Sequence, residues 1–231
     1  MVKGLDTFQK YFADYEEQYV LIGGAACDIL FESNEVNFRA TRDLDMVLIV
    51  EALTPEFGEK FWKFIVDGKY RNKATNGSNP QFYRFDKPED DEFPKMIELF
   101  CRSDFKLKDA KGITPIHIDD EVSSLSAILL NDDYYKALLN GKEVRNGLSV
   151  LRPEYIILFK AKAYLDLQKQ KDLGEKVDSS DIKKHKKDIL RIASELMLEK
   201  VEELPIAVDA DIHSFIDLLE QEPFDQNSLK R

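Results

Sequence analysis

The chain has 231 residues, of which 33 are Lys or Arg and 44 are Asp or Glu, so its formal net charge is −11 at pH 7. An apolar fraction of 43%, with 15 Phe and 9 Tyr, is enough for a sizeable core and excludes a disordered chain. Two cysteines are too few for a disulfide scaffold or a four-cysteine zinc site. The uncharged stretch over residues 18–27 is too short to span a bilayer, and residues 1–6 lack an apolar signal core. We therefore expect a soluble, cytoplasmic protein with no membrane partner.

The first half of the chain alternates short apolar runs with amphipathic stretches, which predicts both strands and helices. The expected strands are residues 19–22, 44–50, 81–85 and 95–101. The expected helices are residues 5–17, residues 25–31 and a helix that begins at Pro55. An acidic segment over residues 88–94 is expected to form an exposed loop between the last two strands.

The second half is predicted to be mainly helical. Its expected helices are residues 121–139, a long helix from Pro153 to about Lys171, a helix capped by Ser179 or Ser180, and a last helix near residues 212–219. Asn146-Gly147 has the signature of a tight β-hairpin. We expect an α+β fold with two domains: a small mixed sheet with flanking helices over residues 1–118, and a helical lobe over residues 119–231.

Asp43 and Asp45 are the acidic residues that most strongly suggest chemistry. They are two positions apart on an expected strand, so they share one face, where two carboxylates repel each other unless a cation lies between them. Oxygen ligands of this kind suit Mg²⁺ better than zinc. Glu98, on a later strand, is the expected third carboxylate, and Asp86 and Asp104 are alternatives near strand ends. Three such carboxylates would complete a two-metal site for phosphoryl transfer.

Gly23 and Gly24 lie between an expected strand and an expected helix. Glycine lets a phosphate chain approach the backbone, and the N-terminus of the following helix binds anions. Arg39 and Thr41 directly precede the acidic pair. The combination indicates a site for a metal-bound polyphosphate.

These residues resemble the nucleotidyltransferase superfamily related to DNA polymerase beta, whose signature is a Gly-Gly or Gly-Ser turn, a downstream Asp-x-Asp and a later acidic residue. The long gap before Asp43, and the Arg-x-Thr-x-Asp-Leu-Asp sequence over residues 39–45, resemble the AbiEii-type branch, which includes toxins of abortive-infection systems. Its Lys-x-x-Ala helix and Lys-Asp pair correspond to residues 160–163 and 187–188. That branch usually has a second aspartate where this chain has Arg191.

The resemblance implies Mg²⁺-dependent transfer of a nucleoside monophosphate from an NTP to a hydroxyl, with release of pyrophosphate. The residues implied to bind the metal are Asp43, Asp45 and Glu98. The residues implied to bind the nucleotide are Gly23, Gly24, Arg39, Thr41 and Lys160. Asp188 is implied as a catalytic base or orienting group. Helical spacing also places Lys160 on an apolar stripe and Lys162 on the solvated face, which favours Lys160 as the triphosphate contact, although a lysine snorkelling past the core has the same pattern.

The acceptor is less defined by these patterns than the nucleotide. The resemblance implies a candidate toxin with an antitoxin partner and the acceptor end of a tRNA as one target. The basic run over residues 183–187 could hold an RNA end, although a net charge of −11 opposes non-specific nucleic-acid binding. Two alternatives stay open: a small-molecule, antibiotic-type nucleotidyltransferase, and a catalytically silent nucleotide-binding or interaction protein.

Overall fold

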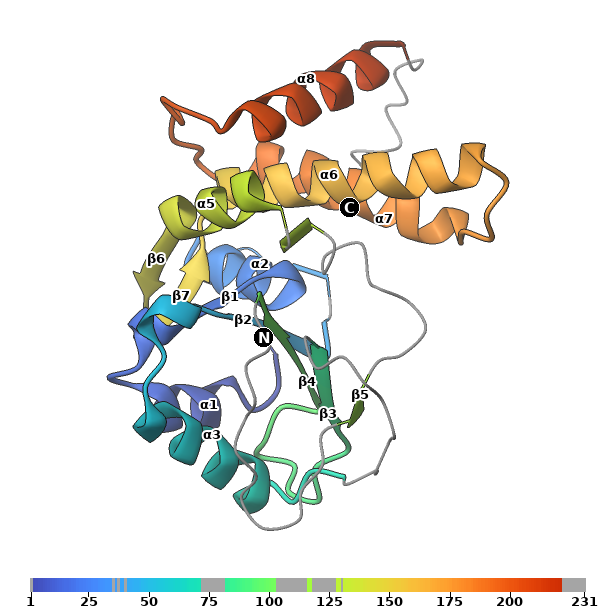
Figure 1. The fold of residues 1–231 in the computed structure, drawn as a ribbon. Helices are drawn as coiled ribbons and strands as arrows, with labels where there is room; N and C mark the ends of the chain where they lie inside the picture. The colour runs from blue at the N-terminus through green and yellow to red at the C-terminus, as the bar shows by residue number, and fades with distance from the viewer. Residues whose placement is uncertain are drawn as a thin grey trace. The chain divides into compact units, whose positions relative to one another are not determined.

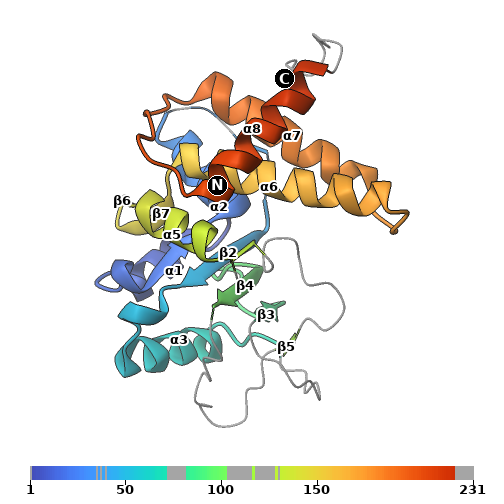
Figure 2. The same cartoon turned by 45° about the horizontal axis from the view of Figure 1, so that its top comes forward.

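The computed structural model describes residues 2–34, 36, 38–39, 41–71, 82–102, 116–117, 128–129 and 131–221. The fold is α+β, as expected, and divides into two compact units (Figures 1 and 2). The first unit is Met1–Val122 with Lys142–Leu151, and the second is Ser123–Gly141 with Arg152–Arg231. Residues 142–151 join the first unit, not the helical lobe expected over residues 119–231, because they pair with its sheet.

The first unit is built on a mixed sheet of seven strands in the order β5-β3-β4-β2-β1-β7-β6. The strands are β1 (Tyr19–Leu21), β2 (Asp43–Leu48), β3 (Phe82–Asp86), β4 (Met96–Cys101), β5 (Ile116–His117), β6 (Lys142–Arg145) and β7 (Leu148–Leu151). The pairs β2–β4 and β1–β7 are parallel, and the other neighbours are antiparallel. The four strands expected in the first half are confirmed, and β5 was not predicted.

The described residues of this unit form the helices α1 (Leu5–Phe12), α2 (Gly23–Glu32) and α3 (Pro55–Asp67). The helix α1 ends well before the expected residue 17, because Asp14 adopts a left-handed conformation with φ of 76°. The helix α3 begins at Pro55 as expected, and the hydroxyl of Thr54 accepts a hydrogen bond from the N–H of Phe57 at 3.3 Å.

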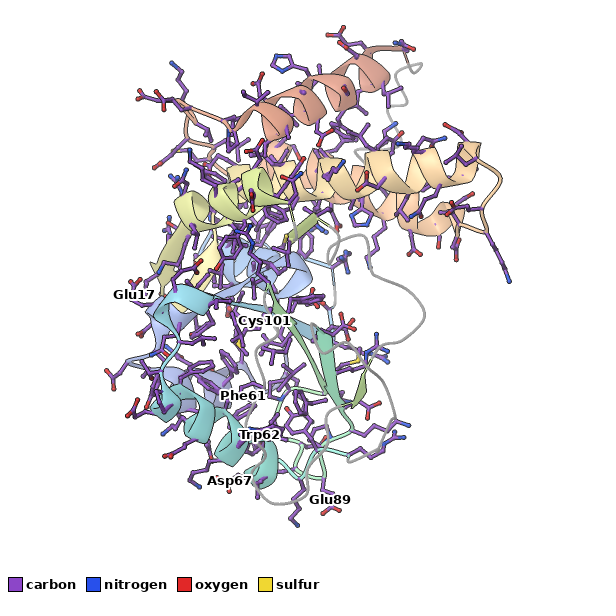
Figure 3. All side chains as sticks on the ribbon, in the orientation of Figure 1. Glu17, Phe61, Trp62, Asp67, Glu89 and Cys101 are labelled. Atoms are coloured by element: carbon purple, nitrogen blue, oxygen red, sulfur yellow. The ribbon has the colours of Figure 1, made fainter. Side chains whose placement is uncertain are left out.

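One face of the sheet packs on α1 and α3 through aromatic rings. Phe8 of α1 lies 5.5 Å from Tyr19 of β1, and Phe61 of α3 lies 5.5 Å from Phe85 of β3, both edge to face. Figure 3 shows Phe61 and Trp62 on α3 at this interface. The helix α2 packs on the opposite face, where Val20, Val47 and Phe100 are also buried, so both faces of the sheet contribute to the core of this unit (Figure 1).

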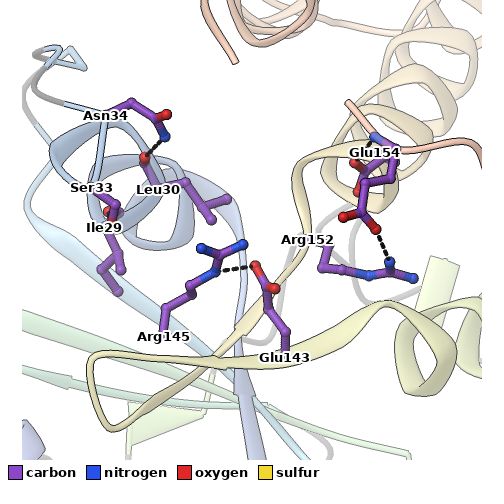
Figure 4. A network of polar contacts seen from close by, with 9 residues as sticks. Ile29, Leu30, Ser33, Asn34, Glu143, Arg145, Arg152 and Glu154 are labelled. Carbon is purple, nitrogen blue, oxygen red and sulfur yellow. Dashed lines mark hydrogen bonds and ion pairs between the residues drawn. The ribbon is translucent and has the colours of Figure 1, made fainter. Parts of the chain in front are cut away.

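The strands β6 and β7 form the hairpin that Asn146-Gly147 predicted. Asn146 and Gly147 have φ of 51° and 70°, as a two-residue turn of type I′ requires. Glu143 and Arg145 of β6 form an ion pair at 2.9 Å (Figure 4). The hairpin is therefore a local structure, and only the pairing of β7 with β1 assigns it to the first unit.

The second unit contains α5 (Asp132–Gly141), α6 (Pro153–Asp172), α7 (Ser179–Glu195) and α8 (Ile206–Gln221). The helix α6 agrees with the expected range, whereas α8 begins at Ile206 instead of near residue 212. The cap of α7 is Asp178, whose side chain accepts from the N–H of Ser180 at 2.8 Å, and not a serine. Residues 121–127 of the expected first helix lie outside the described ranges. No helix in those ranges is long and apolar enough to cross a membrane.

Apolar and polar contacts hold these helices together. The apolar core joins α6, α7 and α8 through Ala161, Tyr164, Ile182, Ile189 and Phe215. The hydroxyl of Tyr134 on α5 donates to Asp211 on α8 at 2.9 Å, and Lys162 on α6 pairs with Asp211 at 3.4 Å and with Asp166 at 3.0 Å.

The helical position of Lys162 predicted a solvated side chain, but the structure gives this lysine two ion-pair partners. Burial by itself lowers the pKa of Lys162, but the two aspartates raise it above its usual value.

Candidate functional site

The carboxylates predicted from the sequence lie on one face of the sheet. In the parallel pairing of β2 and β4, Asp45 stands directly opposite Glu98, and Asp43 stands opposite Met96. Adjacent strands are about 4.8 Å apart, so Asp45 and Glu98 are immediate neighbours. The structure thus places Glu98 next to Asp45, from which it is separated by more than fifty positions in the chain.

Exposure alternates along these strands and shows which face is accessible. Asp43, Asp45 and Glu98 are half-buried, whereas the intervening Leu44 and Ile97 are fully buried. This alternation is the two-residue period of a strand with one face on the core. The carboxylate face is therefore open to solvent at the N-terminal end of β2.

The register also separates the two candidates for the third carboxylate that lie in the described residues. Asp86 of β3 stands opposite Met96, with β4 between it and β2, and Arg71 pairs with it at 3.4 Å. Only Glu98 is on the strand next to Asp45. The other alternative, Asp104, lies outside the described residues.

The two glycines are in the first turn of α2, not in a turn before it. Gly23 has φ of +62°, and a Cβ atom there would lie 2.2 Å from Oδ2 of Asp45. A Cβ atom at Gly24 would lie 2.6 Å from Oγ1 of Thr41. The backbone N–H of Ile22 donates to the carbonyl of Asp45 at 3.0 Å. The start of α2 is thus packed directly against β2 and the segment before it, and a side chain at either glycine would displace Asp45 or Thr41.

The start of α2 also supplies hydrogen-bond donors. The first N–H groups of a helix have no acceptor within it, and the N-cap residue Ile22 contributes no side-chain hydrogen bond. A helix N-terminus favours anions, and carboxylate oxygens favour hard divalent cations. In the described parts of the chain, no three His, Cys, Asp or Glu side chains are already grouped to hold a metal ion. The donors present nevertheless match Mg²⁺ and phosphate chemistry.

Arg84 is a residue of this face that sequence reasoning missed. It stands opposite Glu98 in the antiparallel pairing of β3 and β4, and its Nε and Nη2 groups donate to Oε1 of Glu98 at 2.9 and 2.6 Å. No spacing in the sequence links positions 84 and 98, so only the register reveals the pair. Arg39 is half-buried, and its guanidinium lies 5.3 Å from the centre of the Phe38 ring.

Lys160 and Asp188, the other two predicted site residues, meet in the second unit. Lys160 on α6 and Asp188 on α7 are 7% and 3% exposed, and their side chains form an ion pair at 2.7 Å. Lys160 is thus on the buried side of α6, as its position on the apolar stripe predicted. The structure joins these two predicted residues to each other within the helical unit.

Further polar contacts are drawn in Figure 4. At the C-terminus of α2, Ser33 and Asn34 donate to the carbonyls of Ile29 and Leu30 at 2.9 and 2.8 Å. Before α6, Arg152 pairs with Glu199 at 3.2 Å. These contacts are structural and include none of the predicted site residues.

No protein-family model matches the chain, and no curated protein is significantly similar to it. The site is therefore defined by its own geometry. Half-buried carboxylates lie on two adjacent parallel strands, beside the N-terminus of α2, which begins with Gly23 and Gly24.

We predict that Gly23→Ala destabilises the first unit by about 1–3 kcal/mol, because alanine is strained at positive φ and its Cβ would displace the Asp45 carboxylate. Gly58→Ala is the matched control. A Cβ atom at Gly58 meets nothing within 4 Å, so alanine inside α3 should stabilise by about 0.5–1 kcal/mol. Urea unfolding followed by the fluorescence of Trp62, the single tryptophan, measures both variants. Equal stability of Gly23→Ala and wild type would contradict the packing described.

We also predict that Asp188→Leu destabilises the helical unit by about 3–5 kcal/mol, because it leaves the buried Lys160 ammonium without its counter-ion. Adding Lys160→Met should restore most of that loss. Lys162→Met, which removes a 25%-exposed ion pair from the same helix, should cost no more than about 1 kcal/mol. Thermal unfolding followed by circular dichroism at 222 nm tests the series. A double variant no more stable than Asp188→Leu would show that the pair is not the cause.

Proposed function

We propose that the protein is a nucleotidyltransferase that moves a nucleoside monophosphate from an NTP to a hydroxyl acceptor and releases pyrophosphate. The observation that carries the proposal is the direct pairing of Asp45 with Glu98 on the open face of the sheet, beside the N-terminus of α2. Two like charges in register on adjacent strands are unfavourable without a cation or another compensating group. Arg84 compensates Glu98, and a divalent cation on the same face would compensate Asp45 and Glu98 together, which supports a site for a metal-bound anion.

In this proposal Asp43, Asp45 and Glu98 bind Mg²⁺, which suits their all-oxygen donor set. Bound Mg²⁺ would supply stabilisation of the charge that develops on the transferred phosphoryl group. The backbone N–H groups of Gly23 and Gly24 bind phosphate oxygens, because no side chain shields the backbone there. These residues contribute mainly by positioning and electrostatics, as expected for phosphoryl transfer.

Other residues complete the nucleotide contacts in the proposal. Thr41, packed against Gly24, offers its hydroxyl, and Arg39 offers a guanidinium near the same segment. Lys160 contributes a cation for the triphosphate, and Asp188 holds that cation when no phosphate is bound. Asp188 also stays a candidate base or orienting group.

The acceptor that we favour is RNA, because α7 carries exposed lysines in an otherwise acidic chain. Lys183, Lys184 and Lys187 are exposed and, within the described residues, have no ion-pair partner. Phosphate contacts of this kind position an RNA end without reading its sequence. A role as a toxin, with an antitoxin as partner and a tRNA end as target, stays a prediction of the family resemblance alone.

We predict that Asp43→Asn combined with Asp45→Asn abolishes Mg²⁺-dependent NTP binding while the protein stays folded. Removing two neighbouring charges relieves repulsion, so the apo variant should melt at the same temperature as wild type or a higher one. Calorimetry with each NTP, with and without Mg²⁺, is the measurement. The control is Asp90→Asn with Asp91→Asn in the exposed acidic loop, which removes the same charge and should leave binding unchanged. Equal affinity in the site variant and wild type would refute the metal site.

The acceptor is tested by incubating the protein with labelled NTPs, Mg²⁺ and RNA. Lys183→Glu with Lys184→Glu should lower RNA labelling without changing NTP affinity, and the difference from wild type should shrink as salt rises. Lys169→Glu with Lys171→Glu makes the same charge change on the exposed end of α6 and should have a much smaller effect. Label on an aminoglycoside but never on RNA would favour the small-molecule alternative. NTP binding without transfer to any acceptor would favour the silent nucleotide-binding protein.

A further inference from the structure

Arg84, Glu98 and Asp45 form one row across three strands. Glu98 stands directly opposite Arg84 on one side and directly opposite Asp45 on the other. All three side chains are half-buried on the open face. The central carboxylate therefore has a cation on one side and a second carboxylate on the other.

The hydrogen bonds between Arg84 and Glu98 are one-sided. Both donors, Nε and Nη2, reach the same oxygen, Oε1, at 2.9 and 2.6 Å. Among the described residues, Oε2 of Glu98 receives no hydrogen bond. A guanidinium frequently pairs with a carboxylate through both oxygens, whereas this arrangement fixes the carboxylate through one oxygen and leaves the other for another ligand.

We propose that Arg84 is a positioning residue of the carboxylate site: it holds Glu98 beside Asp45 through Oε1 and leaves Oε2 for a divalent cation. This inference rests on the proposed function, because it needs a cation at this face. Arg84 touches neither metal nor nucleotide in the proposal and acts only through Glu98.

Arg84 affects cation binding in two ways, through its own charge and through the orientation of Glu98, and the two effects have opposite signs. Removing a positive charge next to three carboxylates should by itself strengthen cation binding, because the repulsion between the guanidinium and the cation is lost. Removing the partner that orients a metal ligand should weaken cation binding, typically by 10- to 100-fold. A loss of affinity can therefore only come from the positioning role.

The neighbouring pair of Arg71 and Asp86 provides a matched control. Arg71 and Asp86 are 34% and 25% exposed, close to the 39% and 18% of Arg84 and Glu98. Asp86 lies on the same face but is separated from β2 by β4. Arg71→Gln thus removes the same charge and an ion pair of similar exposure, and it leaves the contacts of Glu98 unchanged.

The experiment is a titration of the full-length protein with Mn²⁺, followed by electron paramagnetic resonance. Arg84→Gln should weaken Mn²⁺ binding by about 10- to 100-fold, whereas Arg71→Gln should leave it unchanged or slightly stronger. Arg84→Lys keeps the charge and one donor, so it should recover part of the affinity. In a Glu98→Gln background the Arg84→Gln change should have no further effect, because its target is already lost. Trp62 fluorescence under urea verifies that each variant is folded.

The outcomes separate this inference from the proposed function. If wild type binds Mn²⁺ and Glu98→Gln weakens that binding, but Arg84→Gln binds as tightly as Arg71→Gln or wild type, the positioning role is wrong and the metal site stands. An equal loss from Arg84→Gln with and without Glu98 would also overturn it. Absence of any Mn²⁺ binding by wild type would overturn both.

Discussion

Two carboxylates in register on adjacent parallel strands are the constraint around which the first unit is organised. Directly opposed like charges destabilise a sheet, so Asp45 and Glu98 need compensation from their surroundings. The structure provides it in three forms: the guanidinium of Arg84, the positive end of α2, and access to solvent on that face. The close approach of α2 depends in turn on Gly23, where any side chain would meet the Asp45 carboxylate.

The opposite face of the sheet keeps this arrangement in place. A slip of one residue between β2 and β4 would turn Asp45 into the core and Leu44 out to solvent. On that face the rings of α1 and α3 pack against Tyr19 and Phe85. A slip would disrupt this close packing of buried rings, and the loss of close packing is costly. The accessible carboxylates on one face and the aromatic packing on the other are thus two consequences of one register.

The helical unit contains two ion-pair arrangements that differ in kind. Lys162 pairs with two partly exposed aspartates, and one of them, Asp211, also accepts a hydrogen bond from Tyr134, so these contacts connect α5, α6 and α8. Lys160 and Asp188 are instead almost fully buried, where desolvation offsets most of the attraction between them. A buried pair of this kind adds little net stability, although removing only one partner is strongly destabilising because it leaves an uncompensated buried charge.

The sequence by itself determined what depends on local periodicity and local backbone geometry. It located the strands of the first half, the start of α3, the hairpin at Asn146-Gly147 and the shared face of Asp43 and Asp45, because each follows from residues a few positions apart. Only the tertiary structure decided that Glu98 is next to Asp45, that Arg84 holds it, and that the hairpin joins the first sheet. The order and register of strands are set by packing between segments far apart in the chain, and no short pattern encodes them.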